Sequence, residues 1–165
     1  MSEKEQAFQE IFKANSKKIY HLCLGYAGDS DAANDLLQET FLKVWQNLEK
    51  FRNQAMISTW IYRIAVNTCL TYLKKEKRTA KDELTPNIIE TVEEEVSEKN
   101  EQVEILYKCI SQLDENERII ITMVMDEIPY PEIAEISGIS EGNLRVKIHR
   151  IKHKLTELYN QHERL

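Results

Sequence analysis

Apolar residues recur every three or four positions along much of the chain, which is the spacing that places side chains on one face of an α-helix. The segment 29–48 reads DSDAANDLLQETFLKVWQNL and carries one apolar stripe, formed by Leu37, Phe41, Val44, Trp45 and Leu48. Ser30 or Asp31 is the expected N-cap, because either side chain can accept a hydrogen bond from the first turn. The pattern therefore predicts a helix whose stripe lies in a core.

The opposite face of this helix is polar and carries Asp35, Gln38, Glu39 and Lys43. Asp35 and Glu39 are four residues apart, so they stack as like charges on the helix surface. We expect no nearby cation to relieve them. This face is either a solvated surface or a docking surface for a basic or polar partner.

The segment 58–78, STWIYRIAVNTCLTYLKKEKR, separates into two arcs at the helical repeat. One arc is apolar and consists of Ile61, Ile64, Ala65, Thr68, Cys69 and Tyr72, and the other consists of Trp60, Arg63, Asn67, Thr71 and Lys74. The second arc combines an aromatic ring, an amide and cations, which can stack on an unpaired base, bond its edge and neutralise phosphate. The alternative is that Trp60 belongs to the core and the cations are only solvated.

The segment 112–155 contains the signals of three helices. Asp114, followed three residues later by Glu117, resembles a capping box, and the helix that it opens buries Ile119, Ile120, Met123, Val124 and Ile128. Pro131 suits the first turn of a short second helix. Gly138 can supply the left-handed residue that ends that helix.

Ser140 is the expected cap of the last helix, which runs to about Tyr159. Its buried stripe is Leu144, Ile148, Ile151, Leu155 and Leu158, and its exposed arc is Arg145, Val146, Lys147, His149, Arg150, His153 and Lys154. A short helix, a glycine turn and a longer helix form a helix-turn-helix, whose second helix can enter the major groove of DNA. The alternative is a helical hairpin with a solvated basic face.

Within that exposed arc, Val146 is an apolar residue among cations. An exposed valine can contact a thymine methyl group, while Arg145 or Arg150 bonds a guanine or a phosphate. The cations belong to a chain of formal net charge −6, with 22 Lys and Arg against 28 Asp and Glu. Charge is therefore segregated along the sequence.

The acidic residues concentrate in 81–100, KDELTPNIIETVEEEVSEKN, where Pro86 interrupts any helix. This composition is typical of a solvated linker. Together with 4 Gly and 3 Pro in the whole chain, the pattern predicts an all-α fold of two small helical domains. We expect an N-terminal domain over 1–80, an acidic linker over 81–101 and a C-terminal helix-turn-helix domain over 102–165.

Several classes of protein are not indicated. No apolar run is long enough to span a bilayer and MSEKEQAFQE is not a signal peptide, so we expect a cytoplasmic protein without direct membrane insertion. Cys23, Cys69 and Cys109 have apolar neighbours and suit buried, reduced thiols. Neither His21 with Cys23 nor the histidines of the basic segment make a metal site. We expect no cofactor and, without a paired acid and base, nucleophile triad or phosphate loop, no enzyme.

Three segments resemble the extracytoplasmic-function sigma factors, small two-domain initiation subunits of bacterial RNA polymerase in the sigma-70 superfamily. They are DAANDLLQETFLKVW, FRNQAMISTWIYRIAVNTCLTYLKK and YPEIAEISGISEGNLRVKIHRIKHKL, in the order and separation of that family. The resemblance covers nearly the whole chain. It implies a non-enzymatic protein that binds core RNA polymerase and directs promoter-specific transcription, and it also implies an anti-sigma factor as a partner.

The resemblance also implies site residues. Core polymerase binding falls on Asp35, Gln38, Glu39, Thr40, Lys43 and Trp45. Recognition of the melted minus-10 element falls on Phe51, Arg52, Asn53, Ser58, Trp60, Arg63, Asn67 and Lys74. Recognition of the minus-35 duplex falls on Ser140, Arg145, Val146, Lys147, His149, Arg150 and Lys152.

The chain departs from the family pattern at a few positions. Pro129 and Pro131 flank Tyr130, where many members cap the short helix with serine or threonine, and Val146 stands where a small polar residue is common. The main rival interpretation is a stand-alone helix-turn-helix regulator, which leaves Asn67 and the acidic face around Glu39 without a role. Two further rival interpretations are a helical adaptor that does not bind DNA and an enzyme that uses the carboxylates of the first domain.

Overall fold

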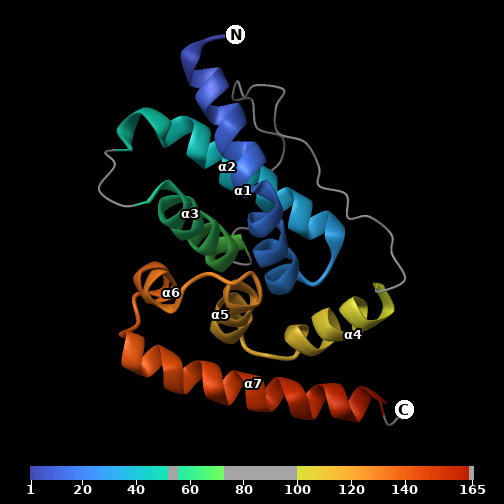
Figure 1. The fold of residues 1–165 in the computed structure, drawn as a ribbon. Coiled ribbons are helices and arrows are strands. Elements are labelled where there is room, and N and C mark those ends of the chain that lie inside the picture. The colour runs from blue at the N-terminus through green and yellow to red at the C-terminus, as the bar shows by residue number, and fades with distance from the viewer. Residues whose placement is uncertain (52–55, 73–99, 164–165) are drawn as a thin grey trace.

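The computed structural model describes residues 1–51, 56–72 and 100–163, and these residues form helices with no β-strand among them (Figure 1). The elements are α1 (Glu3–Ala27), α2 (Ser30–Asn47), the short 3-10 turn η1 (Leu48–Lys50), α3 (Ile57–Tyr72), α4 (Asn100–Ser111), α5 (Glu115–Met125), α6 (Tyr130–Ser137) and α7 (Glu141–Glu163). The predicted all-α class is confirmed. Most of the predicted linker lies outside the described residues, and the last two residues of its range begin α4.

Helices α1, α2 and α3 pack on one another around a core that is aromatic at one end. The rings of Phe12 and Phe41 meet edge to face with centroids 4.9 Å apart at 73°, and those of Phe8 and Trp45 do so at 5.4 Å and 83°. Such pairs add about 0.5–1.5 kcal/mol beyond the burial of their surface. They fix α2 against α1 and so determine which face of α2 remains outside.

The turn between α1 and α2 differs from the sequence prediction. Gly28, with φ of 87°, ends α1 in the left-handed region, and the next residue is extended. Asp29 is therefore the N-cap of α2, and its Oδ1 accepts a hydrogen bond from the backbone N–H of Ala32 at 2.8 Å. The prediction of Ser30 or Asp31 as the cap was wrong by one or two residues, because both already lie inside the helix.

The capping box at the start of α5 is confirmed. The backbone N–H of Glu117 donates to Asp114 Oδ1 at 2.9 Å, and the backbone N–H of Asp114 donates to Glu117 Oε1 at 3.1 Å. Gly138 ends α6 with φ of 73° in the left-handed region. Ser140 Oγ then accepts from the backbone N–H of Asn143 at 3.3 Å at the start of α7. These local signals place the start of α5, the end of α6 and the start of α7.

Helices α6 and α7 and the turn between them form the predicted helix-turn-helix. Pro129 occupies the N-cap position of α6 without any side-chain hydrogen bond, and Pro131 lies in the first turn. The stripe of α7 is buried at Leu144, Ile148 and Ile151 and half-buried at Leu155 and Leu158. The helix continues to Glu163, beyond the expected end near Tyr159.

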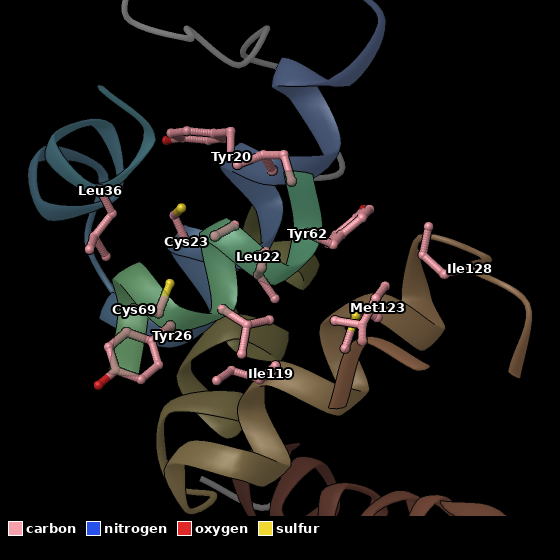
Figure 2. Close-up of a cluster of buried hydrophobic side chains, with 14 of the residues drawn as sticks. Tyr20, Leu22, Cys23, Tyr26, Leu36, Tyr62, Cys69, Ile119, Met123 and Ile128 are labelled. Carbon is pink, nitrogen blue, oxygen red and sulfur yellow. The ribbon is translucent and has the colours of Figure 1, made fainter. Parts of the chain in front are cut away.

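The two halves of the chain pack together into one continuous core. Helix α1 packs on α4 and α5, and α3 packs on α6, whereas α7 lies along the side of α4, α5 and α6 that faces away from α1–α3 (Figure 1). Figure 2 shows Leu22, Tyr26 and Tyr62 of the first half close to Ile119 and Met123 of the second. The two domains that the sequence predicts on either side of a linker are thus in direct contact in this structure.

Candidate polymerase and nucleic-acid interfaces

The outward face of α2 is polar, but its charge differs from the expectation. Asp35 and Gln38 are exposed and Glu39 is half-buried. Lys43 Nζ lies 3.9 Å from Glu39 Oε1 and donates to Thr68 Oγ1 at 3.1 Å. The prediction that no cation relieves these carboxylates was wrong for Glu39, because the lysine stem is long enough to reach back one turn. Asp35 and Gln38 are the most accessible part of this face.

Of the residues predicted to contact polymerase, Thr40 is turned away from solvent and Trp45 is only partly accessible. Thr40 is fully buried, and its hydroxyl donates to the carbonyl of Leu36 at 2.7 Å. Trp45 is half-buried, with the ammonium of Lys4 4.1 Å from its ring centroid. Thr40 was predicted to contact polymerase directly, but in this structure it is a core residue. Its hydroxyl already has a hydrogen-bond partner within α2.

The polar arc of α3, which we define as Trp60, Arg63, Asn67 and Thr71, lies on one side of the helix as predicted. Arg63, Asn67 and Thr71 are exposed, and Trp60 is half-buried. The Trp60 ring lies 5.0 Å from that of Phe51 at 36°. Trp60 is thus partly a core residue and partly accessible at the surface. The predicted site residues Arg52, Asn53 and Lys74 lie outside the described residues.

Arg63 in this arc has a partner that the sequence did not indicate. Its Nη2 lies 3.3 Å from the backbone carbonyl of Glu135 and 3.4 Å from Glu135 Oε1. Glu135 belongs to α6, the first helix of the helix-turn-helix. The two residues are 72 positions apart in the sequence, so no local pattern reveals the contact. Ser58, also predicted to bind DNA, is half-buried at the start of α3.

The outer face of α7 presents most of the residues predicted to contact duplex DNA. Ser140, Arg145, His149, Arg150 and Lys152 are exposed, and Lys147 is half-buried. Val146 is 52% exposed, which confirms that an apolar side chain stands in the open between cations. A valine that is half-exposed leaves apolar surface in water, so its position favours a contact with a partner.

Arg145 is held in place by two neighbours. Its Nη2 donates to Glu141 Oε1 at 2.9 Å, and its guanidinium carbon lies 5.0 Å from the ring centroid of Tyr130 in α6. Glu141 and Arg145 are four residues apart, a spacing at which an ion pair can form on a helix. We did not predict this pair from the sequence. Holding the arginine in this way lowers the conformational entropy that it loses on binding a base or phosphate.

A groove of about 520 Å³ lies between the start of α5 and α7. It is lined by Asp114, Glu117, Asn143, Val146, Lys147, Arg150 and Lys154. Lys154 Nζ donates to Glu117 Oε2 at 2.8 Å, and this hydrogen bond raises the pKa of Lys154. Lys154 therefore ties α7 to α5, whereas Val146, Lys147 and Arg150 are available to a ligand.

The cysteines are free and buried, as predicted. A hydrogen bond with Cys69, followed by burial, raises the pKa of the Cys23 thiol, which favours the unreactive protonated form. Within 1–51, 56–72 and 100–163, no group of His, Cys, Asp and Glu is arranged to hold a metal ion. No helix in the same ranges is both long and apolar enough to cross a bilayer.

Known proteins resemble the chain in both halves. The family model for sigma-70 region 2 matches residues 11–79, and the model for sigma-70 region 4 matches residues 103–155. The ECF RNA polymerase sigma factor SigM of Bacillus subtilis is 28% identical over 155 residues, covering 92% of this chain and 94% of SigM. The ECF RNA polymerase sigma-E factor of Salmonella typhimurium is 30% identical over 161 residues, which cover 90% of this chain and 84% of the sigma-E chain.

Solved structures share the fold at lower identity. The sigma factor RpoE of Bartonella quintana, in complex with the anti-sigma factor NepR, superposes with a TM-score of 0.72 at 17% identity, covering 94% of this chain and 98% of RpoE. CnrH, in complex with the cytosolic domain of CnrY, superposes with a TM-score of 0.69 at 17% identity. The match covers 95% of this chain and 90% of CnrH.

These matches span both halves of the chain in the same order. The protein belongs to the extracytoplasmic-function sigma factors of the sigma-70 family. It is therefore a subunit that binds core RNA polymerase and directs promoter-specific transcription initiation, and not a stand-alone regulator. The members of this family are transcription initiation factors that are not enzymes.

Proposed function

We propose that α7 reads the minus-35 element as duplex DNA. The observation that carries this proposal is the exposed face on which Arg145, fixed by Glu141 and Tyr130, stands beside Val146 and Arg150. Arginine bonds guanine in the major groove through two donors, and an apolar side chain contacts the methyl group of thymine. Lys147 and Lys152 contact phosphates, His149 faces the major groove of the DNA, and Ser140 lies at the helix start where backbone amides favour phosphate.

We infer that the polar arc of α3 holds the unpaired strand of the minus-10 element. Support comes from the accessible part of Trp60 and the exposed Asn67 amide, which suit stacking on a base and bonding its edge. The ring of Phe51 lies against that of Trp60. Residues 51–58 are the proposed site of a base extruded from the duplex, and trapping that base offsets part of the cost of unstacking.

Core polymerase binding is assigned to the outer face of α2. Asp35 and Gln38 supply accessible polar groups, and Glu39 lies beside them with Lys43 within reach. Thr40 and Trp45 support this face from within. Because the chain has a formal net charge of −6, its affinity for free DNA is low, and docking on polymerase is what brings α3 and α7 to the promoter.

The remaining assignments follow from this division of roles. The protein forms and breaks no covalent bond itself, works in the cytoplasm without a cofactor, and is held in check by an anti-sigma factor of the kind that NepR is for RpoE. Its domains are 1–80 and 102–165, joined by the acidic linker 81–101. The acidity of that linker suits a path through a cationic polymerase channel that is built for nucleic acid.

Arg145→Ala and Glu39→Ala are expected to separate promoter reading from polymerase binding. Arg145→Ala is expected to weaken promoter-specific transcription by about tenfold and to leave core binding unchanged. Glu39→Ala is expected to weaken core binding directly. Run-off transcription and native-gel titration of core polymerase measure the two effects. Equal losses of both activities in both variants would contradict the assignment.

A further inference from the structure

The exposed side chains of α7 have two edges, because the helix packs on α6 along one side and on α5 along another (Figure 1). Arg145 lies at the α6 edge, where its guanidinium contacts the ring of Tyr130. Lys154 lies at the α5 edge, where it donates to Glu117. Residues three, four, seven and eleven positions apart share one face of a helix. The α7 residues that share the groove with Lys154 are Asn143, Val146, Lys147 and Arg150.

Asn143 is the member of this set that still has no role. It lies in the first turn of α7 and is exposed. Its backbone N–H donates to Ser140 Oγ at 3.3 Å, whereas none of the described residues bonds its side-chain amide. Asparagine is also a weaker helix former than alanine or glutamate. The amide donor and acceptor are therefore both available to a molecule that enters the groove.

Gly142, the residue before Asn143, is not required by packing within the chain. Gly25 of α1 is required in that way, because an added Cβ there would overlap Thr122 Oγ1 of α5. A Cβ added to Gly142 would have no atom of the described residues within 4 Å, and its φ is not in the left-handed region. Alanine would form the helix better. Glycine at this position instead suits the close approach of another molecule to the backbone.

The chemistry of Asn143 fits the edge of a base. Its amide is uncharged, and Lys147 and Arg150 beside it already supply charge for phosphates. Asp114 is exposed on the other wall of the groove, and its carboxylate disfavours a phosphate nearby. An asparagine amide pairs with adenine through two hydrogen bonds, accepting from the N6 amino group and donating to N7. The first residues of a recognition helix are the ones that contact base edges in the major groove.

We propose that Asn143 is a further specificity-determining residue, which reads one adenine of the minus-35 duplex through N6 and N7, while Gly142 leaves room for the DNA. The inference rests on the proposed reading of that duplex by α7 and adds a contact at the α5 edge of the helix. Asn143 and Arg150 are about 10 Å apart along the axis, at about 1.5 Å per residue. With base pairs stacked about 3.4 Å apart, the adenine lies within about three base pairs of the one that Arg150 reads.

Holoenzyme assembled from core polymerase and the full chain provides the test. A promoter library with every minus-35 position varied first gives the preferred sequence. Each adenine of that element is then replaced, one at a time, by 7-deazaadenine, in which a C–H group takes the place of the N7 acceptor. With the wild-type chain, one replacement is expected to weaken promoter binding by about fivefold, the equivalent of one net hydrogen bond.

Asn143→Ala is expected to weaken binding to the unmodified promoter by about tenfold and to lose the preference for adenine at that one position. The variant is also expected to bind the 7-deazaadenine promoter as well as the unmodified one, because the amide that donates to N7 is gone. Asn160→Ala is the matched control. Asn160 is exposed and lies about 25 Å further along α7, so this variant is expected to respond as the wild-type chain does.

Gly142→Ala separates binding from folding. Alanine favours the helix, so the midpoint of chemical denaturation is expected to rise or to stay unchanged. Promoter binding is expected to fall several-fold, because the added methyl group takes space that the DNA needs. A purely structural role would move stability and binding in the same direction. Unchanged binding, or a fall in both quantities, overturns the assignment of Gly142.

The role of Asn143 is overturned if no 7-deazaadenine replacement distinguishes the wild-type chain from Asn143→Ala. It is also overturned if Asn143→Ala weakens binding equally for all minus-35 sequences, as the loss of a phosphate contact does. Arg150→Ala distinguishes this failure from failure of the proposed function. If Arg150→Ala changes the preference at one base pair and Asn143→Ala changes none, α7 reads the duplex without Asn143. If neither variant changes any preference, the reading of the minus-35 element by α7 is overturned, and the role of Asn143 with it.

Discussion

Phe41→Ala is expected to lower the free energy of unfolding by about 3–5 kcal/mol, the usual loss when a buried phenylalanine is truncated. Phe41 is fully buried, and its ring meets that of Phe12 edge to face at 4.9 Å. The substitution removes the Phe41 contacts with Phe8 and Phe12 of α1 and leaves a cavity. Polymerase binding is expected to weaken with it, because the outer face of α2 loses its support.

Chemical denaturation followed by circular dichroism measures this loss. Gln46→Ala is the control, since Gln46 is exposed on the same helix and surface substitutions of this kind change stability by about 0.5 kcal/mol or less. A loss below about 1 kcal/mol for Phe41→Ala would show that α2 does not pack on α1 as described.

Arg150→Ala is expected to reduce transcription from the preferred promoters by roughly tenfold to a hundredfold and to relax sequence preference at one base pair, equivalent to about 1–3 kcal/mol. Arg150 is exposed and lines the groove with Val146, so its loss removes a contact without disturbing the core. Run-off transcription from a promoter library with every minus-35 position varied measures both effects.

Lys152→Ala is the matched control for Arg150. Lys152 is also exposed on α7, but its assigned contact is a phosphate, which carries no sequence information. Its loss is expected to weaken binding uniformly across promoters and to reduce the salt slope by about 1. If Lys152→Ala changes the sequence preference, the assignment of Lys152 to a phosphate is contradicted. If Arg150→Ala leaves the preference unchanged, the assignment of Arg150 to a base pair is contradicted.

Much of the second half could be predicted from its sequence because its signals are local. The capping box at Asp114, the turn at Gly138 and the buried stripe from Leu144 to Ile151 each depend on residues within a few positions of one another. Helical periodicity converts such spacing directly into a face. The exposed face of α7 could be predicted in the same way, because it consists of the positions that the buried stripe leaves out.

The polar residues of α2 show where periodicity fails. Thr40 counts as polar in any pattern, yet its hydroxyl bonds the carbonyl one turn earlier and the residue is fully buried. Lys43 reaches Glu39 through a flexible stem, which the letter sequence does not display. Side-chain hydrogen bonds to the backbone make a small polar residue compatible with a core.

The contact between the halves depends on pairs that are distant in the sequence. Arg63 with Glu135 and His21 with Asp126 are separated by 72 and 105 positions, and any buried stripe could face several partners. Gly25 was a usable signal, because an isolated glycine inside a helix often marks a close approach. Helices α1 and α4 likewise lie outside the segments whose patterns predicted a particular helix.

Genome-wide run-off transcription with purified core polymerase tests the central claim most directly. With the wild-type protein added, we expect a defined set of start sites that core polymerase alone does not produce, preceded by shared minus-35 and minus-10 sequences. Arg150→Ala should change the minus-35 sequence of that set. If the protein adds no start site from any promoter in the genome, its assignment as a promoter-selecting subunit is contradicted.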